Sequence, residues 1–175
     1  GTGKLPGLRQ LDPGLDPGHP PMIEVASLQG LRSAAQWNVI EFHTWNARKD
    51  RIERPDRMTF DLDPGEGVSW EQVQEAAELV HVLLKELGLP AFLKTSGGKG
   101  LHLMIPLARR DDWATVKAFA KAIAQFMTQR LPERFTATSG LKNRQGKIFI
   151  DYLRNARSAS TVAAYSVRAR PGLPV

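Results

Sequence analysis

The stretch Met58-Thr59-Phe60-Asp61-Leu62-Asp63-Pro64-Gly65 carries the most informative pattern in the chain. Side chains of a β-strand alternate between two faces, so its apolar residues share one face and Thr59, Asp61 and Asp63 share the other. Two strand rises separate the aspartates by roughly 7 Å between Cα atoms. Pro64-Gly65 ends the strand, because Pro has no N–H to donate and Gly permits a sharp turn.

Two carboxylates this close on one face repel each other unless a cation lies between them. Their hard oxygen atoms suit Mg²⁺ or Mn²⁺. They also stand at the C-terminal end of a predicted strand, where sites of α/β proteins commonly lie. The pattern of Asp61 and Asp63 therefore predicts a divalent-metal site, and a solvated Asp-Leu-Asp-Pro turn is the alternative.

The composition is that of an ordinary globular domain. The chain has 175 residues, of which 42% are hydrophobic and 24% charged, enough for one domain with a core. It has no cysteine, which excludes disulfides and thiolate metal sites and favours a reducing cytosol. No apolar run approaches the roughly 18 residues of a membrane span, and the N-terminus does not resemble a signal peptide. We therefore expect a cytoplasmic protein with no membrane partner.

The net charge of +6 is concentrated toward the end of the sequence. Between residues 142 and 170 the one acid is Asp151, and the seven basic residues are Lys142, Arg144, Lys147, Arg154, Arg157, Arg168 and Arg170. A basic segment of this kind indicates a polyanionic partner, such as nucleic acid or nucleotide phosphates. A solvated basic surface is the alternative.

Hydrophobic spacing predicts three helices. They begin at Ser27, at Ser69 and at Asp111 or Asp112, and the last two end at Gly88 and Pro132. Ser69 and Gln72 have the spacing of a capping box. In the first helix, Leu28, Leu31, Ala34 and Ala35 are expected on the buried side.

Alternating residues predict strands over 39–45, 58–63, 92–96, 101–105, 147–153 and 163–170. Short connections between several of them favour hairpins. We therefore expect an α+β fold with a mostly antiparallel sheet and packed helices. Residues 1–26 are expected to be irregular because they begin with a stretch rich in Gly and Pro, and residues 27–175 are expected to form the core domain.

A glycine-rich turn joins the two strands predicted over 92–96 and 101–105. Its backbone N–H groups at Gly97 and Gly98 can approach an anion closely, and Ser96, Lys99 and His102 add a hydroxyl, a charge and an imidazole. A strand–turn–strand arrangement lacks the Walker A spacing, which excludes a P-loop NTPase. The turn therefore predicts a phosphate site, with a tight turn bearing a surface lysine as the alternative.

Asp151 is a lone acid in an otherwise apolar strand, and such a residue is seldom buried without a partner. A metal shared with Asp61 and Asp63 would supply that partner. Three carboxylates can hold two divalent ions that activate a 3′-hydroxyl and stabilise in-line displacement at a nucleotide α-phosphate. The predicted chemistry is nucleotidyl transfer, with the triphosphate held by the glycine-rich turn.

Three segments resemble the motifs of the archaeo-eukaryotic primase superfamily, and more narrowly the polymerase domain of bacterial DNA ligase D. They are Asp61-Leu62-Asp63-Pro64, Lys94 to His102, and Ile150-Asp151-Tyr152-Leu153-Arg154-Asn155. The resemblance runs from about Gly30 to the C-terminus and implies a primase-type (RRM-like) core. It also implies that Asp61, Asp63 and Asp151 bind two Mn²⁺ or Mg²⁺ ions and that Arg144 and Arg168 contact phosphate.

The resemblance implies a DNA repair polymerase that adds ribo- or deoxyribonucleotides at gaps and broken ends in bacterial non-homologous end joining. The implied partners are DNA, nucleoside triphosphates, Ku and a fused ligase domain, in the bacterial cytoplasm at the nucleoid. Domains of this family are longer than 175 residues, so we expect part of a larger polymerase domain.

Two other functions fit parts of the sequence. A catalytically limited module of the same fold would bind nucleotide or DNA ends without turnover. Asp-Leu-Asp after a hydrophobic strand also resembles the first motif of haloacid-dehalogenase-type phosphatases, with a nucleophilic and an acidic Asp. That family requires a parallel sheet with alternating helices, which the hairpins predicted here do not favour.

Overall fold

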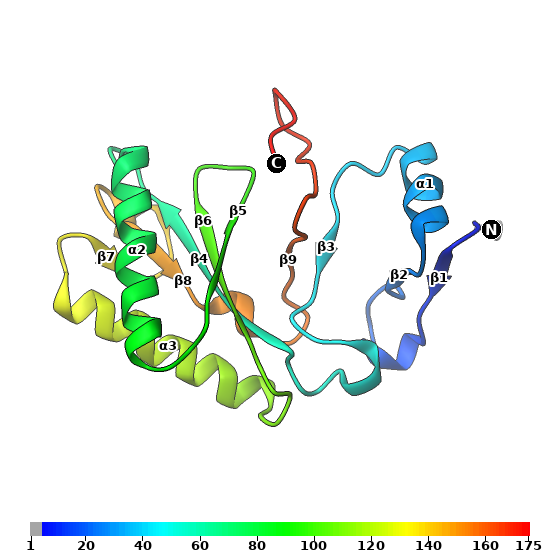
Figure 1. Cartoon of the computed structure of the whole chain (residues 1–175), viewed down its shortest axis with the longest axis horizontal. Coiled ribbons are helices and arrows are strands. Elements are labelled where there is room, and N and C mark those ends of the chain that lie inside the picture. Colours follow the sequence, from blue (N-terminus) through cyan, green and yellow to red (C-terminus); the bar gives the residue numbers. More distant parts are fainter. Residues whose placement is uncertain (1–4) are drawn as a thin grey trace.

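The computed structural model describes residues 5–175, in which one five-stranded sheet forms the centre (Figure 1). The strand order is β5-β6-β4-β8-β7. These strands are β4 (Arg57–Pro64), β5 (Phe92–Thr95), β6 (Leu101–Pro106), β7 (Phe135–Thr136) and β8 (Ile148–Asp151). All neighbours are antiparallel except β7 and β8. The expected α+β class with a mostly antiparallel sheet is confirmed.

Two long helices, α2 (Trp70–Glu86) and α3 (Trp113–Arg130), share one hydrophobic core with the apolar face of the sheet. The alternation predicted for β4 is confirmed, because Met58, Phe60 and Leu62 are each no more than 1% exposed in this core. The predicted capping box of Ser69 and Gln72 begins α2. The other face of β4 is left for polar side chains.

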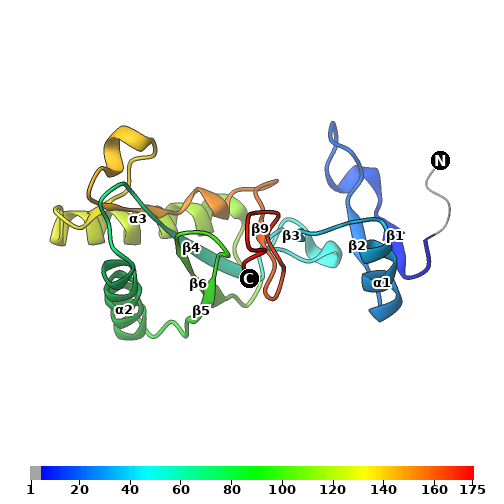
Figure 2. The same ribbon diagram turned by 90° about the horizontal axis from the view of Figure 1, so that it is seen from above.

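A smaller unit precedes this core and consists of β1 (Leu8–Gln10), β2 (Ile23–Val25) and α1 (Leu28–Gln36). The 3-10 turn η1 (Pro13–Leu15) lies between β1 and β2. Figures 1 and 2 show this unit on the far side of β3 and β9 from α2 and α3. The expectation that residues 1–26 are irregular is therefore wrong for residues 8–10 and 23–25, which pair as antiparallel strands; residues 1–4 lie outside the described part.

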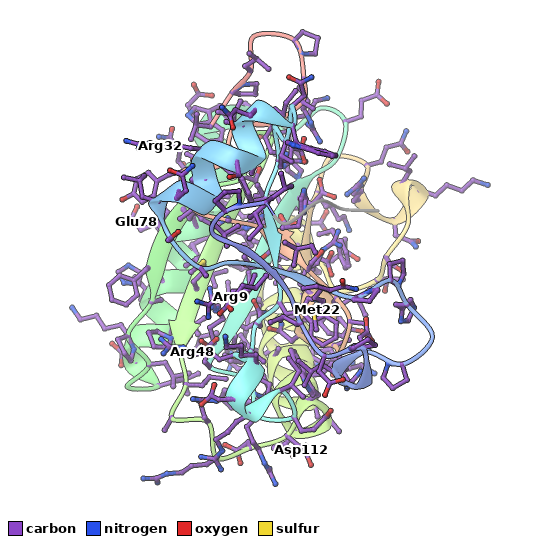
Figure 3. All side chains as sticks on the ribbon, turned by 90° about the vertical axis from the view of Figure 1, so that its right-hand side faces the viewer. Arg9, Met22, Arg32, Arg48, Glu78 and Asp112 are labelled. Atoms are coloured by element: carbon purple, nitrogen blue, oxygen red, sulfur yellow. The ribbon has the colours of Figure 1, made fainter. Side chains whose placement is uncertain are left out.

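Helix α1 begins at the predicted cap Ser27 and buries Ala34 as expected, but Leu28, Leu31 and Ala35 are exposed instead of buried. Figure 3 views the molecule from this side, with Arg32 labelled on α1. Leu28 and Leu31 are 65% and 46% exposed, whereas Ser33 is buried and donates its hydroxyl to Pro6 O at 2.8 Å. The segment around Pro6 lies close to α1 and decides which face of the helix is buried. Small residues on that face permit the close approach.

Two predicted strands are much shorter than expected. In place of 39–45 the structure has β3 (His43–Thr44), and in place of 163–170 it has β9 (Thr161–Val162), which pairs with β3. Beyond this ladder, the Phe42 N–H donates to the Ser166 hydroxyl at 2.9 Å instead of a strand carbonyl. Tyr165 adopts a left-handed φ of 62°, which turns the chain out of an extended path. We call these two neighbouring stretches of the chain, residues 41–44 and 161–169, the ribbon.

The strand predicted over 147–153 ends at Asp151, where the chain enters the 3-10 turn η4 (Leu153–Asn155). Asn155 continues the hydrogen bonding of the sheet with its side chain. Its Oδ1 accepts the Thr59 N–H and its Nδ2 donates to Thr59 O, both at 2.8 Å. Both residues are fully buried. Asn155 therefore fixes the chain that follows Asp151 against β4. Two further 3-10 turns are η2 (Lys49–Arg51) and η3 (Leu141–Arg144).

Among residues 5–175, the helices are all too short or too polar to cross a membrane.

Replacing Asn155 with Ala is expected to lower the free energy of unfolding by about 3 kcal/mol. The buried N–H and C=O groups of Thr59 would both lose the Asn155 side chain as their hydrogen-bond partner. Urea denaturation measures this loss. Asn143→Ala is the matched control, since Asn143 donates to Ser139 O at an exposed position, and it is expected to cost less than about 1 kcal/mol. Equal losses in the two variants would contradict the account of Asn155.

Candidate active site

The strand register brings three polar side chains into one row across β6, β4 and β8. Asp61 lies directly opposite His102 on β6 and directly opposite Asp151 on β8. Residues paired in this way have Cα atoms about 4.5–5.5 Å apart. Asp63 lies two residues farther along β4, on the same face as Asp61. The predicted carboxylates thus come together through strand pairing.

Arginine side chains lie between these carboxylates. Arg154 Nε is 3.0 Å from Asp151 Oδ2 and 3.9 Å from Asp61 Oδ2. Arg144 forms an ion pair with Asp63. On the other side, His102 Nε2 is 3.4 Å from Asp61 Oδ1. Each carboxylate therefore has a basic neighbour, which offsets the repulsion among the three.

Gly65 allows Arg144 to reach the end of β4. A Cβ atom at position 65 would lie 1.6 Å from Arg144 O, so a residue with a side chain does not fit there. The Gly65 N–H also donates to Lys147 O at 2.9 Å. Besides ending the strand, Gly65 therefore leaves room for the backbone of Arg144.

Asp151 has the most strongly perturbed environment of the three. Its side chain is 9% exposed, and its Oδ1 accepts the Leu153 N–H at 2.8 Å. Burial raises the pKa of the Asp151 carboxyl, and the charges of Asp61 and Asp63 raise it further, whereas Arg154 and the Leu153 N–H act in the opposite direction. Additional positive charge at this place would favour the ionised form.

The donor set fits a divalent cation in its chemistry. Three carboxylates supply hard oxygen ligands, and burial with mutual repulsion creates a demand for positive charge. Within residues 5–175, however, no group of three or more His, Asp or Glu side chains is arranged so that it could hold a metal ion. Arg144 and Arg154 now supply the positive charge instead.

The glycine-rich turn between β5 and β6 lies beside this row. Ser96 Oγ donates to Gly100 O at 2.8 Å and accepts the Gly98 N–H at 3.2 Å, so it shapes the turn. Lys99 is exposed. Arg168 reaches the turn from the ribbon and donates to Ser96 O at 2.6 Å. The ribbon and the hairpin together form the wall of a cleft.

Lys94, at the base of the hairpin, orients His102. Its Nζ donates to His102 Nδ1 at 3.0 Å and to Val162 O at 2.8 Å. This pairing places the imidazole proton on Nε2, the atom that faces Asp61. Burial lowers the pKa of the Lys94 ammonium, and the charge of Asp61 partly opposes that effect.

The cleft has a volume of about 340 Å³ and brings most of the predicted site residues together. Those that line it are Asp61, Asp63, Ser96, Gly98, Lys99, His102 and Arg168. Gly97, Arg144 and Asp151 are not part of its lining, and they contact it through Arg168, Asp63 and Arg154 respectively.

Sequence reasoning missed several residues of this cleft. They are His43, Arg154, Ser160, Thr161, Val162 and Arg170. Arg154 had a usable signal, because it follows the lone acid Asp151 by three residues. The others lie in the ribbon or directly beside it, and the short β3–β9 pairing has too few residues to produce a pattern.

A second cavity, of about 980 Å³, lies between the N-terminal unit and the ribbon. Its walls are mainly apolar and include Leu8, Trp37 and Phe42. None of the three predicted metal ligands lines it. The polar cleft is therefore the better candidate for phosphate and metal chemistry.

Comparison with known proteins shows which family the chain belongs to. The family model described as "LigD, primase-polymerase domain" matches residues 3–175. The multifunctional non-homologous end joining protein LigD of Pseudomonas aeruginosa is 60% identical over 172 residues, which are 98% of this chain and 20% of that protein. The LigD of Mycolicibacterium smegmatis is 38% identical over 144 residues, which are 81% of this chain and 19% of that protein.

A solved structure shares the fold. The polymerase domain of Mycobacterium tuberculosis ligase D, in complex with DNA, matches with a TM-score of 0.80 and 37% identity. The match covers 88% of this chain and 56% of the solved chain. The chain spans about one fifth of the length of the curated relatives described above. The resemblance seen in the sequence is confirmed: the chain belongs to the LigD primase-polymerase domain family.

Proposed function

We propose that this chain carries out template-directed nucleotidyl transfer, adding ribo- or deoxyribonucleotides to a DNA 3′ end. The observation that supports this most strongly is one cleft in which two of the three aspartates and the glycine-rich turn face each other. The third aspartate, Asp151, lies directly opposite Asp61 in the strand register. A metal site beside a phosphate site is the arrangement that this reaction needs.

Asp61, Asp63 and Asp151 would hold two divalent ions, Mn²⁺ or Mg²⁺. When bound, the ions would activate the attacking hydroxyl and neutralise charge that develops on the phosphates. In the structure, two of these carboxylates form ion pairs, Asp63 with Arg144 and Asp151 with Arg154. Both guanidinium groups would then be released toward the incoming phosphates, for which their planar donor geometry is well suited.

The remaining lining residues would position the triphosphate. Lys99 supplies an exposed positive charge at the turn, and Arg168 supplies a second from the ribbon. Gly98 is exposed and leaves the backbone of the turn accessible to oxygen atoms of the ligand, whereas Gly97 lies beneath the Arg168 side chain. His102 stands between Lys94 and Asp61, with Nε2 available to donate a hydrogen bond.

The wider biological role is proposed from the relatives. Their names place them in non-homologous end joining, and the solved mycobacterial domain is in complex with DNA. We therefore propose that the chain acts on gapped or broken DNA in the bacterial cytoplasm, as part of a protein that also carries a ligase domain and works with Ku. The seven basic residues between 142 and 170 support a DNA partner.

A binding module without turnover is the second candidate. It is favoured by one observation, that Arg144 and Arg154 pair with Asp63 and Asp151, two of the carboxylates that would have to bind the metal ions. The phosphatase alternative requires a parallel sheet, and it is contradicted because both neighbours of β4 run antiparallel to it.

Primer extension on a gapped duplex with a 5′-phosphate distinguishes the two remaining candidates. A polymerase incorporates nucleotides in the presence of Mn²⁺, and comparing ribo- with deoxyribonucleotides gives its sugar preference. A binding module retains nucleotide in a calorimetric titration but leaves the primer unextended.

Asp61→Asn and Asp151→Asn are expected to lower the incorporation rate at least ~100-fold, because each removes a charged ligand from the reacting centre. The fold is expected to tolerate Asp151→Asn. Burial raises the pKa of Asp151 above its ordinary 3.8, so the folded state disfavours the charge. The destabilising contribution of this one carboxylate therefore shrinks as the pH falls through its raised pKa.

Thermal unfolding at pH 7 tests whether the fold tolerates Asp151→Asn. The unfolding midpoint of this variant is expected to equal or exceed that of the unchanged chain. Asp111→Asn, at an exposed position, is the matched control and is expected to keep full activity. Full incorporation by either site variant would refute the metal-binding role.

Lys99→Ala is expected to raise the KM for nucleoside triphosphate about 10-fold with little change in kcat, because one charge-assisted phosphate contact is lost. Steady-state primer extension measures both constants. The control Lys121→Ala removes an exposed lysine from α3 and is expected to change neither. An unchanged KM in Lys99→Ala would leave the turn without a phosphate role.

A further inference from the structure

The Glu41 carboxylate makes three polar contacts close to the cleft, although Glu41 does not line it. Its Oε1 accepts the Ala169 N–H at 2.7 Å and lies 3.1 Å from Arg168 Nε. Its Oε2 is 2.7 Å from His43 Nε2. Arg168 and His43 both line the cleft, whereas Glu41 does not. One carboxylate thus holds two cleft residues that come from different strands of the ribbon.

Arg168 passes from Glu41 to the glycine-rich turn. Its Nη1 donates to Ser96 O at 2.6 Å, while its aliphatic stem covers Gly97. A Cβ atom at position 97 would lie 2.4 Å from Arg168 Cγ, and Gly97 has a left-handed φ of 62°. The Arg168 side chain is 16% exposed. Its guanidinium is therefore held from both ends, by Glu41 on one side and by the turn on the other.

The Glu41 carboxylate is well suited to this task. Contacts with the His43 side chain, then the Ala169 N–H and then the Arg168 guanidinium lower the pKa of Glu41 to about 2. It therefore keeps its negative charge at every pH at which the protein would be assayed. A permanent charge beside an arginine restricts the orientations of a side chain that otherwise has many rotamers.

We propose that Glu41 is a positioning residue for nucleotide binding, which orients Arg168 against the Ser96–Lys99 turn and His43 at the cleft rim. This inference rests on the proposed function, since it assumes that Arg168 meets the phosphates of a nucleoside triphosphate. Glu41 itself touches neither substrate nor metal. Its contribution is the orientation of the guanidinium before the ligand arrives.

The test compares Glu41→Gln with the unchanged chain in Mn²⁺-dependent binding of ATP by calorimetry and in primer extension. The amide keeps nearly the same shape and can still accept the Ala169 N–H, but it lacks the charge. The expected result is an ATP dissociation constant and KM raised about 10-fold, the size of one lost charge-assisted contact, with kcat within about twofold. Glu75→Gln breaks a Glu–Arg pair of 2.8 Å on α2 and is expected to change neither constant.

A double-variant cycle separates positioning from general loss of structure. In the Arg168→Ala background, Glu41→Gln is expected to have less than a twofold effect, because the residue that it orients is absent. Ser166→Ala weakens the ribbon at the Phe42 N–H without touching Arg168, and it is expected to raise the dissociation constant less than Glu41→Gln does. Equal effects of Glu41→Gln in both backgrounds, or an equal effect of Ser166→Ala, would overturn the positioning role.

The outcomes also distinguish this inference from the proposed function. If the unchanged chain binds ATP and Glu41→Gln binds it equally well, the positioning role is refuted and the proposed function stands. If the unchanged chain binds no nucleotide at all, the proposed function fails and the role of Glu41 fails with it.

Discussion

Asp61 and Asp151 stand directly opposite each other on neighbouring strands, and the electrostatic cost of that pairing shapes the polar side of the molecule. Like charges across a strand pair destabilise a sheet, and burial of Asp151 adds to the cost. The structure offsets this with two arginines that come from separate elements, Arg154 from η4 and Arg144 from η3, and His102 Nε2 faces Asp61 from β6.

The opposite face of the same strand makes this arrangement possible. Met58, Phe60 and Leu62 anchor β4 beneath α2 and α3, so that the carboxylates of the polar face are held on a rigid support. Asn155 extends the pairing past the end of β8 and fixes η4, the turn that carries Arg154. The ribbon then closes the cleft from the other side. Each part of the candidate site is thus carried by an element that its own contacts hold in place.

The sequence predicted the elements whose residues repeat regularly. β4, the hairpin of β5 and β6, and helices α2 and α3 each show a clear period over enough residues to be recognised. The motifs quoted from these elements also led to the correct family. The residues proposed to bind metal and nucleotide lie in or beside one cleft, and their roles stay predictions.

The parts that could not be predicted depend on contacts between distant segments. β3 and β9 have two residues each, too few for a period, and the ribbon turns at Tyr165 through a backbone conformation that tyrosine rarely adopts. The face that α1 buries is decided by the approach of Pro6 to Ser33. The pairing of Arg144 with Asp63 requires η3 to pass over Gly65. None of these leaves a local signature in the sequence.

The proposed mechanism depends on Asp61, Asp63 and Asp151 forming a site for divalent cations. Counting Mn²⁺ ions bound to the chain by electron paramagnetic resonance, with and without a non-hydrolysable nucleoside triphosphate, tests it most directly. Two bound ions are expected in the presence of nucleotide, together with tight binding that is lost in Asp61→Asn. Failure to bind Mn²⁺, or binding that survives this substitution unchanged, would contradict it.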